Sequence, residues 1–429
     1  MYSIVGTFKI DTDIRSQTIN KTLLVIALVW PEPASTAAGV RIIQLLKVFK
    51  QQGYSITIAS AASKSEFSAD LNVLGFETVD IKMNDASFDH FIKSMNPSIV
   101  MFDRFLTEEQ FGWRVVENCP DAIRVLDTED LHSLRHVREQ CFKKDIPFST
   151  EAWLADDKTK REIASIYRCD LSLIISSFEL ELLTDVLKID KSLLLLLPFM
   201  VPEITIETKW TPFEERKDFV FIGGGKHAPN LDAIKTLKTI IWPLLQKQLP
   251  EATIHVYGAY LPQQILEMNK PNERFLVHGR AADVHEIMKM AKLCLAPIRF
   301  GAGIKGKLVA AMQNGTPSVT TTIGAEGMHG ILDWNGYIEN DHTAFVEAAV
   351  RLYTAKLPWK KAQEQGKTLI NTLYSQHTLQ HIFIEKLKQL QKELGIHRQR
   401  NFTGALLHHQ TMTATKFMGK WIEEKNREL

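Results

Sequence analysis

Apolar residues in the first half of the chain fall into short continuous runs, separated by segments with helical periodicity. The first run, residues 23–29, is aliphatic throughout, which is typical of a central parallel strand covered on both faces. Residues 40–49 carry apolar side chains at helical spacing, and Gly53 ends that segment. Further strands are predicted at residues 54–59, 78–81, 98–102, 123–127, 171–175 and 193–197. This alternation predicts a doubly wound parallel sheet.

A second alternation follows a segment with three prolines and little periodicity, residues 198–212, which is typical of a linker. Its strands are predicted at residues 219–222, 253–257, 275–278, 293–297 and 318–322, with helices at 230–248 and 282–291. The pattern predicts a second Rossmann-like domain, with the boundary near residue 203. From about residue 343 the strand signals end, and helices are predicted at residues 343–354, 358–374 and 378–394.

We therefore expect an α/β chain of two Rossmann-like domains with a helical C-terminal extension. The predicted division is a loose leader at residues 1–20, an N-terminal domain at 21–203, a C-terminal domain at 204–380 and a helical segment at 381–429.

The last segment contains an apolar stripe at helical spacing, formed by Phe417, Met418, Trp421 and Ile422. Such a stripe favours packing against the protein over docking on a membrane. The neighbouring pair His408 and His409 diverges by about 100° on a helix, which disfavours a shared metal ion. We expect no metal or cofactor.

Overall charge excludes some classes of partner. The 51 basic residues nearly balance the 50 acidic ones, which argues against bulk attraction to nucleic acid. The four cysteines form no C-x-x-C pair, so neither a disulfide framework nor a zinc site is indicated, and we expect a cytoplasmic protein. The longest apolar runs reach about half of the ~20 residues that cross a bilayer, so no transmembrane segment is predicted, while peripheral membrane contact stays open.

The strongest chemical signal is a turn between the predicted strand at residues 293–297 and a short helix that stops at Gly315. The turn and the start of the helix hold the glycines and cations Arg299, Gly301, Gly303, Lys305, Gly306 and Lys307. Glycines let the backbone approach a ligand closely, and the first helix amides lack internal partners. Together with two lysines, this turn predicts a diphosphate site.

Two other interpretations of the turn stay open. It can be an ordinary glycine turn with solvated lysines, since such turns are frequent in α/β proteins. Residues 301–307 also spell G-x-x-x-x-G-K, the phosphate loop of nucleoside triphosphatases, but Leu308 stands where that loop needs a magnesium-binding Ser or Thr.

The tandem arrangement with a glycine and lysine turn late in the second domain resembles GT-B glycosyltransferases. The second domain resembles the family-4 retaining glycosyltransferases at residues 219–225, 228–233, 299–307, 314–319 and 323–327. The first domain resembles them more loosely, at residues 31–39, at Asp103 and at residues 127–132. The resemblance implies a nucleotide-sugar donor in the second domain, and an acceptor that meets it from the first.

The residues can support that chemistry. Cationic groups that neutralise a departing nucleoside diphosphate lower the barrier, and Lys305 and Lys307 suit this role. Gly223, Gly224 and Gly225 form a second glycine turn, which is either a donor contact or a simple tight turn.

Family members usually carry two glutamates eight residues apart around the lysine turn, and this chain has Ala302 and Ala310 at those positions. A carboxylate is the natural acceptor for two ribose hydroxyls. Glu326 is our candidate substitute, with a plain surface position as the alternative. The nearest cation to the second glycine turn is Lys226.

In the first domain, His132 follows an acid-rich loop at the end of a strand, where ligands of open α/β sheets bind. The resemblance implies a donor-sugar or acceptor contact for it. Asp103 and Asp127 end their strands, and each could orient an acceptor hydroxyl or cap a helix. Gly39 closes the loop that the resemblance places on the acceptor side.

The leading hypothesis is a glycosyltransferase that moves a sugar from a nucleoside diphosphate to a hydroxyl of a glycan, a lipid or a small molecule, with retention. The alternatives are a non-catalytic GT-B binding or scaffold protein, which Ala302 and Ala310 support, and a sugar-nucleotide epimerase.

Overall fold

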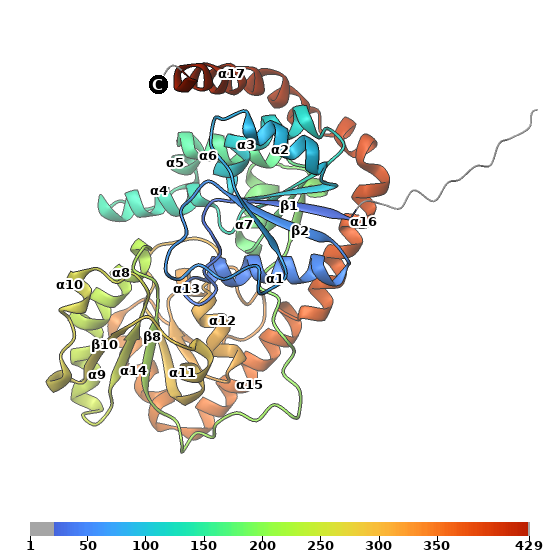
Figure 1. Ribbon diagram of the computed structural model, residues 1–429. Helices are drawn as coiled ribbons and strands as arrows, with labels where there is room; N and C mark the ends of the chain where they lie inside the picture. Colours follow the sequence, from blue (N-terminus) through green and yellow to red (C-terminus); the bar gives the residue numbers. More distant parts are fainter. Residues whose placement is uncertain (1–20, 428–429) are drawn as a thin grey trace, which may run out of the picture.

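The computed structural model describes residues 21–427, so the predicted leader at residues 1–20 lies outside the described part of the chain. Two parallel sheets, each flanked by helices, form two domains that face each other (Figure 1). This arrangement confirms the prediction of two Rossmann-like domains with a helical C-terminal region.

The first sheet has seven parallel strands in the order β3-β2-β1-β4-β5-β6-β7. They are β1 (Thr22–Ala27), β2 (Ser55–Ser60), β3 (Glu77–Asp80), β4 (Ile99–Asp103), β5 (Ile123–Asp127), β6 (Leu171–Ile174) and β7 (Leu194–Leu196). The central strand β1 is aliphatic because both faces are covered, and Leu23 to Ile26 are fully buried.

Before the linker, the described part of this domain has the α-helices α1 (Ala37–Gln51), α2 (Ser87–Met95), α3 (Phe105–Asn118), α4 (His132–Lys143), α5 (Thr150–Ala155), α6 (Asp157–Arg168) and α7 (Ser177–Glu181). Thr36 caps α1 by accepting a hydrogen bond from the Gly39 amide, which sets where that helix begins.

The second sheet has six parallel strands in the order β10-β9-β8-β11-β12-β13. They are β8 (Lys217–Ile222), β9 (Ile254–Tyr257), β10 (Phe275–Gly279), β11 (Ala291–Ala296), β12 (Ser318–Thr320) and β13 (Gly336–Ile338). The edge strand β13 was not predicted, because it has only three half-buried residues and begins with a glycine.

The helices between these strands are α8 (Ala228–Thr236), α9 (Trp242–Gln248), α10 (Gln263–Leu266), α11 (Val284–Met290), α12 (Gly306–Gln313) and α13 (Thr322–Ala325). The predicted helix at residues 230–248 corresponds to α8 and α9, which a π-helical segment at Leu237–Ile241 connects. Helix α12 follows the glycine and lysine turn, as predicted.

Four helices end the described chain: α14 (His342–Thr354), α15 (Lys356–Leu373), α16 (Gln376–Arg400) and α17 (Phe402–Arg427). Helices α14 and α15 pack on the second domain, whereas α16 runs back along the first (Figure 1). Leu379, Phe383, Leu387 and Leu390 of α16 are buried in the core that contains Leu23 of β1. Helix α16 continues through Gly395, so the predicted end at residue 394 was wrong.

Helix α17 lies across α3 and α6 (Figure 1). It leaves apolar side chains exposed to solvent. Phe417, Met418 and Trp421 are 65%, 58% and 60% exposed, so the expectation that this stripe packs against the protein was wrong. His408 is directed to the first domain, where its Nε2 lies 2.9 Å from the carbonyl oxygen of Arg168. Among residues 21–427, no helix combines the length and the apolar character that a bilayer crossing requires.

The chain crosses between the domains twice, and the two crossings are hydrogen-bonded to each other. The Val201 amide donates to the carbonyl of Tyr374 at 2.9 Å, and the Gln376 amide donates to the carbonyl of Val201 at 2.9 Å. The linker and the start of α16 are therefore joined at one place.

Candidate active site between the domains

A cavity of about 900 Å³ opens between the two domains and is lined by residues of both. The first domain contributes the loop after β1, the start of α1 and the segments that follow β4 and β5. The second contributes the segments after β8, β9, β10 and β11 and the first turns of α12. The cavity thus lies where the carboxyl ends of both sheets meet, which is where ligands of open α/β sheets bind.

The glycine turn before α12 touches the opposite domain. Gly303 has a φ of 64°, and a Cβ there would lie 2.7 Å from the Cβ of Asp130, so only glycine fits. The Gly303 amide donates at 2.8 Å to Oε1 of Glu179, a first-domain residue. The turn is therefore positioned by both domains.

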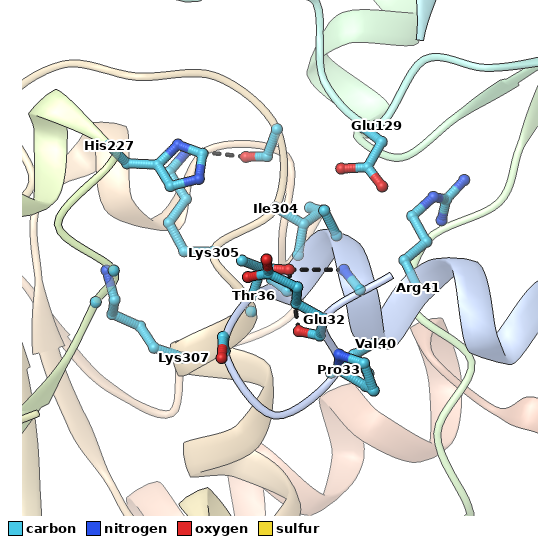
Figure 2. A pocket seen from close by; sticks show the side chains of 18 of the residues that line it. Glu32, Pro33, Thr36, Val40, Arg41, Glu129, His227, Ile304, Lys305 and Lys307 are labelled. Atoms are coloured by element: carbon cyan, nitrogen blue, oxygen red, sulfur yellow. Dashed lines mark hydrogen bonds between the residues drawn. The ribbon is translucent and has the colours of Figure 1, made fainter. Parts of the chain in front are cut away.

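Lys305 and Lys307 both line the cavity and stand at the beginning of α12 (Figure 2). Lys305 Nζ donates to the carbonyl of Gly303 at 2.8 Å, and Lys307 Nζ donates to Oδ1 of Asn230 at 2.6 Å. Burial lowers the pKa of each ammonium group to about 8. Two poorly hydrated cations beside free helix amides form a site suited to a diphosphate.

Three residues that the sequence assigned to the donor site, Gly225, Arg299 and Glu326, do not line the cavity. Arg299 pairs with Asp232 at 2.5 Å and does not line it. Glu326 accepts two hydrogen bonds from Arg138, at 2.7 and 2.9 Å, so it is not placed to replace a ribose-binding glutamate. Arg138 also donates to the carbonyl of Gly301 at 2.8 Å. The Arg138–Glu326 pair therefore holds the glycine turn from behind.

The second glycine turn is divided between two roles. Gly223 and Gly224 line the cavity, whereas Gly225 packs against the backbone of Tyr260, where a Cβ would lie 2.1 Å from the Tyr260 carbonyl oxygen. The Tyr260 hydroxyl donates to the carboxylate of Glu32 in the first domain, with oxygen distances of 2.8 and 2.9 Å. This contact holds the domains together on one side of the cavity.

Of the three predicted catalytic residues, the cavity brings together two. Asp103 and His132 line it, but Asp127 does not. Asp127 is fully buried and accepts three hydrogen bonds from Arg41, at 2.8 to 3.1 Å. Its position therefore corrects the catalytic assignment, because Asp127 balances a buried arginine.

His132 begins α4, with its ring edge against Phe105. Its Nε2 lies 3.3 Å from Oδ1 of Asp130. Burial lowers the pKa of His132 to about 3, so the ring is neutral at pH 7. A neutral imidazole at the cavity wall can exchange hydrogen bonds with a sugar hydroxyl.

Gly39 lines the acceptor side, in the first turn of α1, where a Cβ would lie 2.3 Å from the Glu32 carbonyl carbon. Ala302 and Ala310 also line the cavity, so neither position supplies a carboxylate.

Sequence reasoning missed Arg104 and Glu129, which line the cavity beside Asp103 and His132. Both have positive φ, 72° and 62°, a conformation that non-glycine residues rarely adopt and that often marks functional sites. Burial raises the pKa of Glu129 to about 8, and Arg104 Nη2 lies 3.4 Å from its Oε2. Their places one residue after β4 and two residues after β5 were the available signal. Other cavity residues that were missed are Glu32, Asp130, Arg135, His227, Arg280 and His285.

Two facing Rossmann-like domains with a cavity between them and a C-terminal helix that returns to the first domain define the GT-B class of fold. Residues 216–355 match the model of a family described as Glycosyl transferases group 1. The second domain thus carries the sequence pattern of this family, and the resemblance to GT-B glycosyltransferases is confirmed. No curated protein sequence gives a significant match.

Solved structures with the same fold are similar to nearly the whole chain. A glycosyltransferase from Rickettsia africae superposes with a TM-score of 0.61 at 13% identity, over 87% of this chain and 99% of that one. Anabaena Alr3699/HepE in complex with UDP has a TM-score of 0.61 at 12% identity, over 86% and 100%. The pneumococcal O-GlcNAc transferase GtfA, in complex with UDP and GlcNAc, has a TM-score of 0.64 at 11% identity, over 87% and 99%.

Proposed function

We propose that this protein transfers a sugar from a nucleoside diphosphate to a hydroxyl group of a glycan, a lipid or a small molecule, with retention of configuration. The observation that carries the proposal is a pair of cations, the buried Lys305 and the half-buried Lys307, at the amino end of α12 on the wall of the interdomain cavity. The family match of the second domain supports it, as do the UDP complexes of HepE and GtfA.

In this proposal the leaving diphosphate develops charge against the two ammonium groups and the first amides of α12, and no metal ion takes part. The acceptor approaches from the first domain, past Asp103, Glu129 and His132. Burial raises the pKa of Glu129 to about 8, so the carboxylate that forms as the pH approaches 8 is basic enough to accept the proton that the acceptor hydroxyl releases.

A second candidate function is a binding protein that keeps the fold without turnover. The observation that favours it is the pair of alanines, Ala302 and Ala310, on the cavity wall. A carboxylate that accepts from ribose or sugar hydroxyls is missing at both places.

A panel of UDP-, GDP-, ADP- and dTDP-sugars distinguishes these functions. A bound sugar nucleotide raises the melting temperature, because ligand that binds only the native state stabilises it by RT ln(1+[L]/Kd). Release of free nucleoside diphosphate identifies a transferase, and an epimerised sugar nucleotide identifies an epimerase. A thermal shift without either product favours the binding protein. No shift with any sugar nucleotide contradicts the proposal.

The affinity for a nucleoside diphosphate is expected to fall as the pH rises through 8. The free protein loses the protons of Lys305 and Lys307 there, so binding the diphosphate must take them up again. Well above pH 8 the affinity falls by about tenfold per pH unit for each lysine. Calorimetric titrations between pH 7 and 9 measure it, with the unphosphorylated nucleoside as a control.

The stability of the free protein should not follow that trend. Between pH 8 and the ordinary lysine pKa of 10.5, the native state holds fewer protons on these lysines than the unfolded chain does. Their contribution to the free energy of unfolding therefore rises with pH in that interval. For the binding prediction, an affinity for the nucleoside diphosphate that stays constant from pH 7 to 9 would contradict the placement of the diphosphate beside Lys305 and Lys307.

A further inference from the structure

The wall of the cavity beyond the lysine turn is formed by the second domain. Ala310 lies four residues, about 6 Å along the helix axis, beyond the first residue of α12, Gly306. Gln313 lines the cavity about one turn further on, and His285 of α11 lines it as well. In the proposed function a diphosphate lies at the start of α12, and the sugar at one end of it faces the acceptor, which comes from the first domain. The nucleoside at the other end of the diphosphate then lies against this wall of the second domain.

His285 is held beside Ala310 by a side chain that touches both. Asn314, at the end of α12, has its Nδ2 2.8 Å from the carbonyl oxygen of Ala310 and 2.9 Å from Nδ1 of His285. Asn314 is 5% exposed, and its own carbonyl accepts a hydrogen bond from Arg216 at 2.7 Å. The position of the imidazole ring is therefore set by a buried residue.

The same contacts determine which ring nitrogen of His285 carries the proton. A carbonyl oxygen only accepts, so the atom of Asn314 that faces Ala310 must be its amide nitrogen. That nitrogen donates to His285 Nδ1 as well, which makes Nδ1 an acceptor. In the neutral ring the proton is then on Nε2, on the side away from Asn314.

We propose that the Nε2–H group of His285 binds a ribose hydroxyl of the nucleoside diphosphate, in place of the carboxylate that position 310 lacks. This inference rests on the proposed function. A hydroxyl oxygen accepts as readily as it donates, so a ring N–H can hold the group that a carboxylate would otherwise hold. One hydrogen bond replaces two, so the ribose is held less firmly than a bidentate carboxylate would hold it.

The test is calorimetric binding to the full chain. UDP, GDP and ADP are titrated first, and the tightest is compared with its 2′-deoxy and 3′-deoxy forms and with inorganic pyrophosphate. The unchanged protein is expected to prefer the ribonucleotide about five- to tenfold over at least one deoxy form, as one net hydrogen bond provides. His285→Ala is expected to bind the ribonucleotide about five- to tenfold more weakly, to lose that preference and to bind pyrophosphate as before.

A further variant separates binding from folding. His285→Gln retains a neutral N–H donor and is expected to recover part of the ribose preference.

Specific outcomes would overturn the inference. An unchanged ribose preference in His285→Ala contradicts it, and so does an equal loss of affinity for the ribonucleotide, its deoxy forms and pyrophosphate. Either result leaves the proposed function standing. If the unchanged protein binds pyrophosphate and every nucleoside diphosphate equally poorly, the proposed function fails, and the inference fails with it.

Discussion

Replacing Lys305 and Lys307 together with methionine is expected to lower sugar transfer at least a hundredfold, about 2.7 kcal/mol of transition-state stabilisation. Both ammonium groups are buried at the cavity wall, where charge interactions are stronger than in water. Methionine keeps the aliphatic stem of each side chain, so the packing around α12 is retained. Release of nucleoside diphosphate from the donor that the panel identifies measures the effect.

Lys420→Met on the exposed side of α17 is the control, since it makes the same kind of replacement once, far from the cavity. Its transfer rate should equal that of the unchanged protein. The melting temperature of the double variant should stay close to that of the unchanged protein, because desolvation of the two cations is no longer required. Transfer within threefold of the original rate in a folded double variant would rule out the assigned role of the lysines.

Replacing Arg41 with methionine is expected to lower the free energy of unfolding by about 3–5 kcal/mol. The guanidinium donates three hydrogen bonds to Asp127 and one to the carbonyl of Leu197, and both charged side chains are buried. Without Arg41, the carboxylate of Asp127 stays buried with no counter-charge. Denaturant unfolding followed by circular dichroism measures the loss.

The double variant Arg41→Met with Asp127→Leu tests the cause. Removing both charges takes away the uncompensated carboxylate, so most of the stability lost in the single variant should return. A folded double variant that retains sugar transfer would show that Asp127 has no part in the chemistry. Equal instability of the single and double variants would mean that the charge imbalance is not the reason.

The fold could be predicted because strands that are buried on both faces have continuous apolar runs in the sequence. The aliphatic run at residues 23–29 corresponds to β1, and the glycine turn before α12 lies where its residue types required. Strand β13 has no such run, because its three residues are only partly buried. The apolar stripe of α17 has the spacing of a packed face and yet faces outward, and spacing alone does not show which elements cover it.

The site could be predicted only as far as residue type determines position. Lys305 and Lys307 reach the cavity because the turn and the helix place them there. Glu326 does not, since its partner Arg138 comes from the other domain, more than 180 residues away in sequence. Arg104 and Glu129 were missed because their residue types do not indicate the positive φ that they have in the structure. A non-glycine residue at positive φ can be recognised only once the structure around it is known.

The pairing of Val201 with Tyr374 and Gln376 brings both covalent connections between the domains to one spot. A hinge rotation of one domain against the other would leave this pairing intact. It would have to break the contacts of Glu32 with Tyr260, of Glu179 with Gly303 and of Arg138 with Glu326. Opening of the cavity by such a rotation would therefore be opposed by polar contacts alone at these three places.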